Sequence, residues 1–251
     1  MSGHSKWATI KRKKGAADAK RGQIFTRLTR EIVMAARDGG GDIDSNFRLR
    51  LAVDKARAQN MPKENIERAI KRGTGDSKEG AVFEEVFYEG YAPHGVALMI
   101  SCVTENRNRT VAEVRHILSR SGGNLGEAGS VSWQFKRMAY FSIPAQGKTY
   151  DEIFELAVDA GADDVIEEDG VFEIYAPVES FKIVSDRLRA AKIQPEEAEL
   201  RMISTQDIEL PVDATIQVMK AIEALEDLDD VQSVFSNLKI SQEAMAALEE
   251  E

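Results

Sequence analysis

The chain has 251 residues, 43% of them hydrophobic, and its 33 Lys and Arg against 43 Asp and Glu give a formal net charge of -10. This apolar content is enough for packed cores and excludes a globally disordered chain, and the length favours two domains. The longest apolar run, 96–103, is interrupted by Ser101 and is too short to span a bilayer, and the N-terminal cations are not followed by the apolar core of a secretory signal. The single cysteine, Cys102, is expected to be buried in a reducing compartment. Together these features predict a cytoplasmic protein with no membrane partner.

Positive charge is concentrated at the front of the chain. Residues 1–78 contain 19 Lys and Arg and 9 Asp and Glu, whereas residues 79–251 contain 14 and 34. Residues 3–37 alone carry ten cations and two acids, and Trp7 precedes four consecutive cations at 11–14. A basic block in an acidic chain is typical of a polyanion site, and an aromatic ring beside it suits base stacking. The alternative is a solvated basic face, with Trp7 only holding the arm to the helices.

The first unit, residues 1–78, is predicted to contain three helices. In the first, from about residue 17 to 37, apolar residues recur at helical spacing on one face. The cations that fall roughly opposite this face are Lys20, Arg27, Arg30 and Arg37. The glycines at 39–41 are expected to end this helix.

Local signals also mark the other two helices of this unit. Asp44 or Ser45 is expected to cap the second helix. The third helix is expected to begin at Met61-Pro62, since proline suits the first helical position, and to end at Gly73. The composition of residues 73–77 predicts a linker after it.

Strands and helices alternate after the linker. Residues 82–89 and 96–104 are predicted strands, Asn108 is expected to cap a helix over 109–119, and the glycine-rich residues 121–130 are expected to form a loop before a short strand at 131–135. Arg107 and Arg109, at the start of this helix, form a candidate secondary phosphate contact. The alternative for these two arginines is ordinary helix-surface charge.

A β-α-β-β-α-β order follows, which is the ferredoxin-like pattern. Strands are predicted at 138–143, 165–168, 171–175 and 198–203. Thr149 and Glu152 form a capping box for a helix that ends at Gly161, and Asp169-Gly170 is a hairpin signal. Pro177 precedes the second helix of this unit.

The tail repeats half of this scheme, with extended residues at 208–210, a helix after Pro211 and a strand at 231–235. These elements do not make a domain alone, but they could complete the sheet that begins at residue 82. We therefore predict three domains: a basic helical one (1–78), a discontinuous α/β one (79–136 plus 205–240), and an inserted ferredoxin-like one (137–204). The fold class is α+β, multidomain.

Motifs for catalysis are incomplete. Residues 147–149, Gly-Lys-Thr, resemble the end of a phosphate loop, but Ser142 stands where its first glycine is required. The histidines at 4, 94 and 116 have no HExxH or CxxC companions, and the acidic pairs at 163–164 and 167–168 indicate a solvated edge. We expect no catalytic residue, metal, cofactor or small-molecule substrate.

Six segments carry a resemblance to a known family. They are GHSKWATIKRKK (3–14), GGGD (39–42), NMPKENIERAIKRGTG (60–75), YEGYAPHGVA (88–97), ENRNRTVAEVRH (105–116) and GGNLGEAGSVSW (122–133). Together they resemble the YebC family, whose members include bacterial proteins described as transcriptional regulators and a mitochondrial translational activator. The resemblance implies a helical N-terminal domain followed by two α/β domains, and nucleic-acid binding without catalysis. It also supports the arm at 6–14 and the segment 60–73 as binding residues.

The sequence thus predicts a non-enzymatic regulatory protein, a transcriptional regulator that binds DNA through its basic N-terminal domain. The alternatives are a ribosome-associated translational activator bound to ribosomal RNA, and a protein-interaction scaffold. The expected partners are nucleic acid and either the ribosome or the transcription machinery. The residues expected to contact nucleic acid are Lys6, Trp7, Lys11, Arg12, Lys13, Lys14, Lys20, Arg21, Arg27, Arg30, Lys63, Arg68, Lys71 and Arg72.

Overall fold

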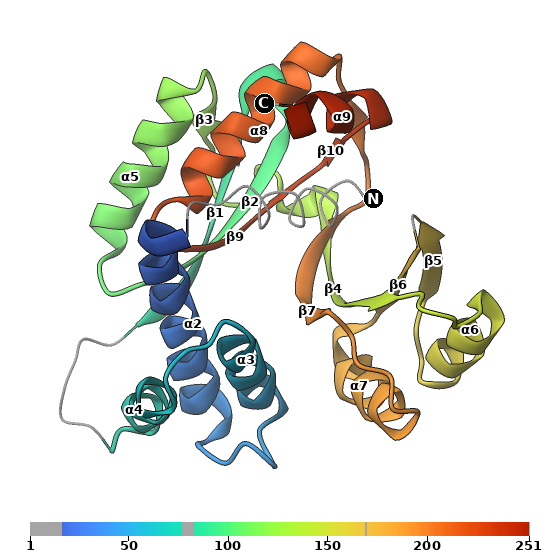
Figure 1. Ribbon diagram of the computed structural model, residues 1–251. Coiled ribbons are helices and arrows are strands. Elements are labelled where there is room, and N and C mark those ends of the chain that lie inside the picture. Colours follow the sequence, from blue (N-terminus) through green and yellow to red (C-terminus); the bar gives the residue numbers. More distant parts are fainter. Residues whose placement is uncertain (1–16, 77–82, 169, 251) are drawn as a thin grey trace. The chain divides into compact units, whose positions relative to one another are not determined.

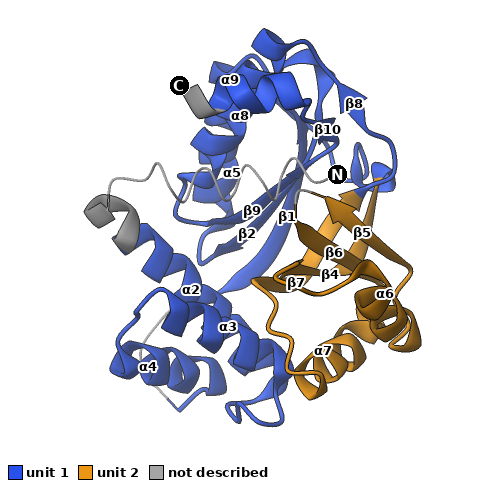
Figure 2. Ribbon diagram, turned by 45° about the vertical axis from the view of Figure 1, so that its right-hand side comes forward, with its two compact units in different colours: residues 1–134, 204–251 blue, residues 135–203 orange. Residues whose placement is uncertain are grey.

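The computed structural model describes residues 17–76, 83–168 and 170–250 (Figure 1). The chain divides into two compact units, shown in different colours in Figure 2: unit 1 comprises residues 1–134 and 204–251, and unit 2 residues 135–203. Helices come first and sheets with helices follow, so the predicted multidomain α+β class is confirmed. Within the described ranges, no helix is both long and apolar enough to cross a membrane.

Unit 1 begins with the three expected helices. They are α2 (Ala17–Gly39), α3 (Phe47–Ala58) and α4 (Lys63–Thr74). Ile32, Leu49 and Val53 are fully buried in the apolar core that the helices share. α2 ends where Gly40 takes a positive φ of 84°, a conformation that glycine adopts without a steric penalty.

The cap of α3 differs from the expectation. Asn46, not Asp44 or Ser45, is the N-cap. Its Oδ1 accepts a 3.1 Å hydrogen bond from the Leu49 N–H, and its Nδ2 donates a 2.7 Å bond to the carbonyl of Ala35 in α2. The cap therefore also joins two helices, and this second bond depends on tertiary structure rather than on local sequence.

The end of α4 also differs from the expectation. The helix continues through Gly73 to Thr74 and is capped by Gly75, which has a φ of 81°. A Cβ at Gly73 would lie 2.5 Å from the carbonyl oxygen of Val33 in α2. Gly73 therefore allows α4 to approach α2 closely and does not stop the helix.

The rest of unit 1 is built on an antiparallel sheet in the order β3-β1-β2-β9. The strands and helices of this part are β1 (Glu84–Tyr91), β2 (Ala97–Thr104), α5 (Arg107–Arg120), β3 (Asn124–Leu125), α8 (Val212–Glu226) and β9 (Val231–Ser236). The tail strand β9 pairs with β2, and α5 and α8 pack together beside the sheet (Figure 1). β8 (Ile208–Glu209) and β10 (Leu238–Lys239) form a small parallel pair, and α9 (Gln242–Glu250) follows.

β2 is buried on both of its faces. Leu98, Ile100 and Cys102 pack into the core formed with α5 and α8, whereas Val103 belongs to the core of the three helices. Burial, assisted by the negative charge of Asp230, raises the pKa of the Cys102 thiol to about 12. The thiol is therefore protonated at neutral pH.

Several local expectations in this part were wrong. Asn106, not Asn108, caps α5, since its side chain accepts from the Arg109 N–H at 3.1 Å. A 3-10 turn, η2 (Ser132–Gln134), stands where a strand over 131–135 is predicted, and the glycine-rich loop contains β3. Neither β10 nor α9 is anticipated from the sequence.

Unit 2 has the predicted βαββαβ order, with its sheet arranged β5-β6-β4-β7. Its elements are β4 (Phe135–Pro144), α6 (Tyr150–Asp159), β5 (Asp164–Glu168), β6 (Val171–Ala176), α7 (Phe181–Ala190) and β7 (Glu197–Ser204). The capping box of Thr149 and Glu152 is confirmed, as is the antiparallel β5–β6 hairpin. Figure 2 shows α6 and α7 on the same face of this sheet.

Candidate nucleic-acid interface

Most of the predicted arm lies outside the described residues. This holds for Lys6, Trp7, and the cations at 11–14. Lys20 and Arg21 lie in the first turns of α2, but their side chains are outside the described part. The described cations among the expected binding residues lie in α2 and α4.

α4 presents three exposed cations. Lys63, Arg68 and Lys71 are exposed. Lys63 lies 3.6 Å from Glu67, an i,i+4 pair at the surface. The side chains of Arg68 and Lys71 make no hydrogen bond or ion pair with any described residue, so their charges are available to a phosphate.

Arg72 has a different environment on the same helix. Its Nη2 donates a 2.8 Å hydrogen bond to Glu105, and its guanidinium stands 4.3 Å from the centre of the Phe83 ring. These contacts join α4 to Phe83, which precedes β1, and to Glu105, which follows β2. Arg72 therefore has a structural role in addition to the binding role expected of it.

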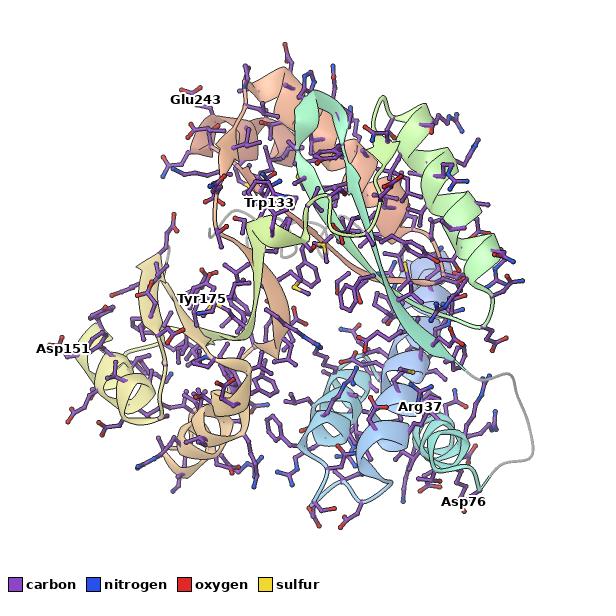
Figure 3. The ribbon with its side chains drawn as sticks, turned by 180° about the vertical axis from the view of Figure 1, so that it is seen from behind. Arg37, Asp76, Trp133, Asp151, Tyr175 and Glu243 are labelled. Atoms are coloured by element: carbon purple, nitrogen blue, oxygen red, sulfur yellow. The ribbon has the colours of Figure 1, made fainter. Side chains whose placement is uncertain are left out.

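The arginines of α2 fall into two groups. Arg27 is half-buried, and its Nε has no hydrogen-bond partner among the described residues. Arg30, in contrast, is buried and lies 2.8 Å from the carboxylate of Asp230. A phosphate could reach the Arg30 guanidinium only if that ion pair opened, which differs from the exposed contact expected. The exposed Arg37, labelled in Figure 3, donates to the Phe83 carbonyl.

Asp230 is the centre of a buried polar network. Its Oδ2 accepts hydrogen bonds from Thr104 at 2.9 Å and Thr110 at 2.7 Å, and Arg109 bonds both oxygens at 3.0 and 2.8 Å. Burial alone would raise the pKa of Asp230, but the hydrogen bonds of Arg109, Thr110 and Thr104, with the charge of Arg30, hold it below its ordinary value. Asp230 is therefore ionised at neutral pH and joins α2, β2 and α5.

The same network bears on the candidate secondary phosphate contact. Arg109 is bound to Asp230, and Arg107 forms an ion pair with Glu84. Both side chains are half exposed or more, at 50% and 63%, but each positive charge already has a carboxylate partner. A phosphate at this position would compete with both carboxylates.

Trp133 is an exposed aromatic residue that was not anticipated as a functional residue from the sequence. It is 65% exposed, and its Nε1 donates a 3.1 Å hydrogen bond to the Ser130 carbonyl. Figure 3 labels this side chain. The Tyr91 hydroxyl donates to the same carbonyl at 3.1 Å. The sequence signal that could have identified this residue is a tryptophan directly after a glycine-rich loop. The pattern around it instead predicts a strand.

Glu89 fixes the loop that precedes Trp133. Its carboxylate accepts hydrogen bonds from the backbone N–H groups of Gly129 at 2.8 Å, Val131 at 2.7 Å and Ser132 at 2.9 Å. Burial opposes ionisation, but these donors lower the pKa of Glu89 below its ordinary value. Glu89 therefore holds in place the turn that carries the Trp133 side chain.

In the described part of the chain, no group of three or more His, Cys, Asp or Glu side chains is arranged to hold a metal ion. The class that emerges is a multidomain α+β protein that begins with a helical unit bearing exposed cations on α4. Family models agree with this class. The TACO1/YebC N-terminal domain matches residues 5–76, and the TACO1/YebC second and third domains match residues 83–238. The chain therefore belongs to the TACO1/YebC family, and the resemblance seen in the sequence is confirmed.

Proteins similar in sequence match this chain over its full length or nearly so. A protein of Chlorobaculum tepidum described as a probable transcriptional regulatory protein is 51% identical over 252 residues, covering 100% of both chains. One of Borrelia turicatae with the same description is 53% identical over 243 residues, covering 97% of this chain and 99% of the relative. The crystal structure of a conserved hypothetical protein from Aquifex aeolicus matches with a TM-score of 0.82 and 43% identity, covering 90% of this chain and 93% of that one.

Proposed function

We propose that this protein is a regulatory protein that binds DNA through its basic N-terminal domain and catalyses no reaction. One observation carries the proposal: residues 1–78 hold a large excess of cations, whereas the remainder of the chain is strongly acidic. Phosphate contacts by Lys and Arg supply much of the affinity of proteins for DNA. The description of the relatives as probable transcriptional regulatory proteins supports the same role.

The proposed interface combines the N-terminal arm with α4. Lys6 and the cations at 11–14 would contact the phosphate backbone, and Trp7 would stack on a base. Arg68 and Lys71 would add phosphate contacts from the exposed side of α4. Gly73 supports this arrangement because it lets α4 pack closely on α2 and so fixes the position of those cations.

The acidic remainder has a complementary role in this proposal. We assign residues 79–136 plus 205–240 to one α/β domain and residues 137–204 to a second one inserted into it. Their combined negative charge repels nucleic acid and confines binding to residues 1–78. They are thus available for contacts with other proteins in the cytoplasm.

A second candidate function is a translational activator that binds ribosomal RNA. The exposed Trp133 favours it, because a free aromatic ring stacks on unpaired bases, which loops in RNA offer and an intact DNA duplex does not. Sedimentation of cell extracts through a sucrose gradient separates the two functions. Co-migration with ribosomes after DNase treatment supports the RNA function, and its loss supports the DNA function.

The test of the first function is binding of the full chain to labelled duplex DNA and to labelled RNA at several salt concentrations. Replacing Lys11, Arg12, Lys13 and Lys14 together by Ala should weaken binding and reduce the salt slope by about 0.9 for each phosphate of duplex DNA that is no longer neutralised. The matched control removes four exposed cations of unit 2 instead: Lys182, Arg187, Arg189 and Lys192. Equal affinity of the two variants for both polymers would refute the role of the arm.

A further inference from the structure

Helix α6 of unit 2 exposes a second apolar stripe. Ile153 and Ala157 face the core of the unit and are fully buried. Tyr150, Phe154 and Val158, spaced four residues apart on an adjacent face, are 37%, 42% and 45% exposed. The rings of Tyr150 and Phe154 stack with their centres 5.5 Å apart. Large apolar side chains aligned along one exposed face suit contact with a partner better than contact with water.

The stripe lies next to the open edge of a sheet. β5 is the terminal strand in the order β5-β6-β4-β7, and among the described strands it pairs with β6 only. The Tyr150 hydroxyl donates a 3.1 Å hydrogen bond to the Val165 carbonyl, so the stripe begins at this strand. An edge strand offers main-chain donors and acceptors to another extended chain. At Val165 both groups already have side-chain partners, Tyr150 for the carbonyl and Asp164 for the N–H at 2.9 Å, which an added strand would displace.

This region is also strongly acidic. Residues 149–170 contain nine Asp and Glu and no Lys or Arg. The acids are Asp151, Glu152, Glu155, Asp159, Asp163, Asp164, Glu167, Glu168 and Asp169. Among the described ones, Asp163 alone has a cationic partner, Lys136 at 3.3 Å. The negative charge around the stripe and the edge is therefore largely uncompensated.

The charge selects the kind of partner. Nucleic acid would be repelled, and a second copy of this surface would bring a second set of nine acids against the first. A cationic chain gains from the same field. An extended chain also presents alternate side chains to one face, so apolar residues could cover the α6 stripe while cations meet the carboxylates.

We propose that α6 and β5 together form a docking surface, the α6–β5 surface, for an extended Lys/Arg-rich segment of another protein. The segment adds to the outer edge of β5 as a further strand and displaces the two side-chain contacts of Val165. Its apolar side chains pack on Phe154 and Val158, and its cations pair with the acids of residues 151–168. This surface lies in unit 2, and the proposal does not depend on nucleic-acid binding by residues 1–78.

The test uses the full chain and a fluorescent peptide of alternating Lys and Val residues, measured by fluorescence anisotropy. Binding is expected, and it should weaken as salt is added. A Glu–Val peptide should not bind, because its charge has the wrong sign. A Lys–Pro peptide of equal charge should not bind either, because proline cannot donate to a strand ladder. Equal binding of the Lys–Val and Lys–Pro peptides overturns the proposal, since charge alone would then explain the result.

Two variants locate the binding surface. Phe154→Ser should weaken binding of the Lys–Val peptide about tenfold, as expected for an aromatic contact at an interface. Ile183→Ser is the matched control, because Ile183 is 53% exposed on the other helix of unit 2. Circular dichroism checks that both variants remain folded. Unchanged affinity of Phe154→Ser refutes the docking surface, and so does a dimer in analytical ultracentrifugation that Phe154→Ser dissolves, because the occupant would then be a second copy.

Discussion

Arg30 of α2 lies 2.8 Å from the carboxylate of Asp230, which directly precedes β9. Both side chains are nearly excluded from water, at 11% and 2% exposure. Arg30 also donates to the carbonyl of Asp229. An arginine in a basic helix thus connects that helix to the acidic α/β part of unit 1.

The first prediction concerns the stability of this pair. Arg30→Ala leaves a buried carboxylate with fewer partners and should lower the free energy of unfolding by about 3 kcal/mol. Arg57→Ala is the matched control, since its pair with Asp54 is exposed and should contribute at most about 1 kcal/mol. Urea unfolding followed by circular dichroism measures both values. Equal effects of the two substitutions would show that the Arg30 pair does not stabilise the fold.

The second prediction concerns pH. Because the pKa of Asp230 is lowered in the folded protein, its contribution to stability is present at neutral pH and above the unfolded pKa of about 4. That contribution is lost as the pH falls through the folded pKa. Wild type should therefore be more stable than Asp230→Asn at pH 7, and the difference should shrink below about pH 4. Urea midpoints of both proteins across this range measure it, and a difference that grows on acidification contradicts the assignment.

The third prediction concerns the cap of α3. Asn46→Ala removes the N-cap and the hydrogen bond to Ala35, and should cost about 2 kcal/mol. Asp44→Ala removes an exposed side chain that does not cap the helix, and should change stability by less than about 0.5 kcal/mol. Thermal unfolding of the two variants compares them directly. A larger loss for Asp44→Ala would restore the cap expected from the sequence.

The fourth prediction concerns the exposed cations of α4. Replacing Arg68 and Lys71 by Ala should reduce the salt slope of nucleic-acid binding by about 1 for each phosphate that these side chains neutralise. Stability should change little, because neither side chain bonds to a described residue. Replacing Lys182 and Arg187 of α7 by Ala gives the control with the same change in charge. An unaltered slope for the α4 variant would place the interface elsewhere.

Local signals in the sequence predicted local structure well. The Thr149–Glu152 capping box and the Asp169-Gly170 turn each depend on residues within a few positions of one another, and the helix and hairpin they indicate are both present. The three N-terminal helices and the βαββαβ order were predicted for the same reason. In each case the periodicity or turn chemistry is complete within one segment.

Contacts between distant segments could not be predicted in this way. Asn46 caps α3 and also bonds the carbonyl of Ala35, a contact between two helices that the local sequence does not indicate. The sequence likewise does not distinguish Arg30 from the other cations of α2, because its partner Asp230 lies two hundred residues later. The local pattern around Trp133 predicts a strand, whereas the turn found there depends on Glu89, about forty residues earlier in the chain. Charge counting predicts where cations are plentiful, but it does not show which of them are already paired.

The buried position of Cys102 makes its thiol a natural probe of unfolding in unit 1. The thiol lies in the strand shared by both cores of unit 1, has no exposed surface and is protonated at neutral pH. Since the thiolate is the reactive form, iodoacetamide can modify this chain only after the central strand opens. The rate of alkylation therefore reports the rarest and largest fluctuations of unit 1, without any introduced label.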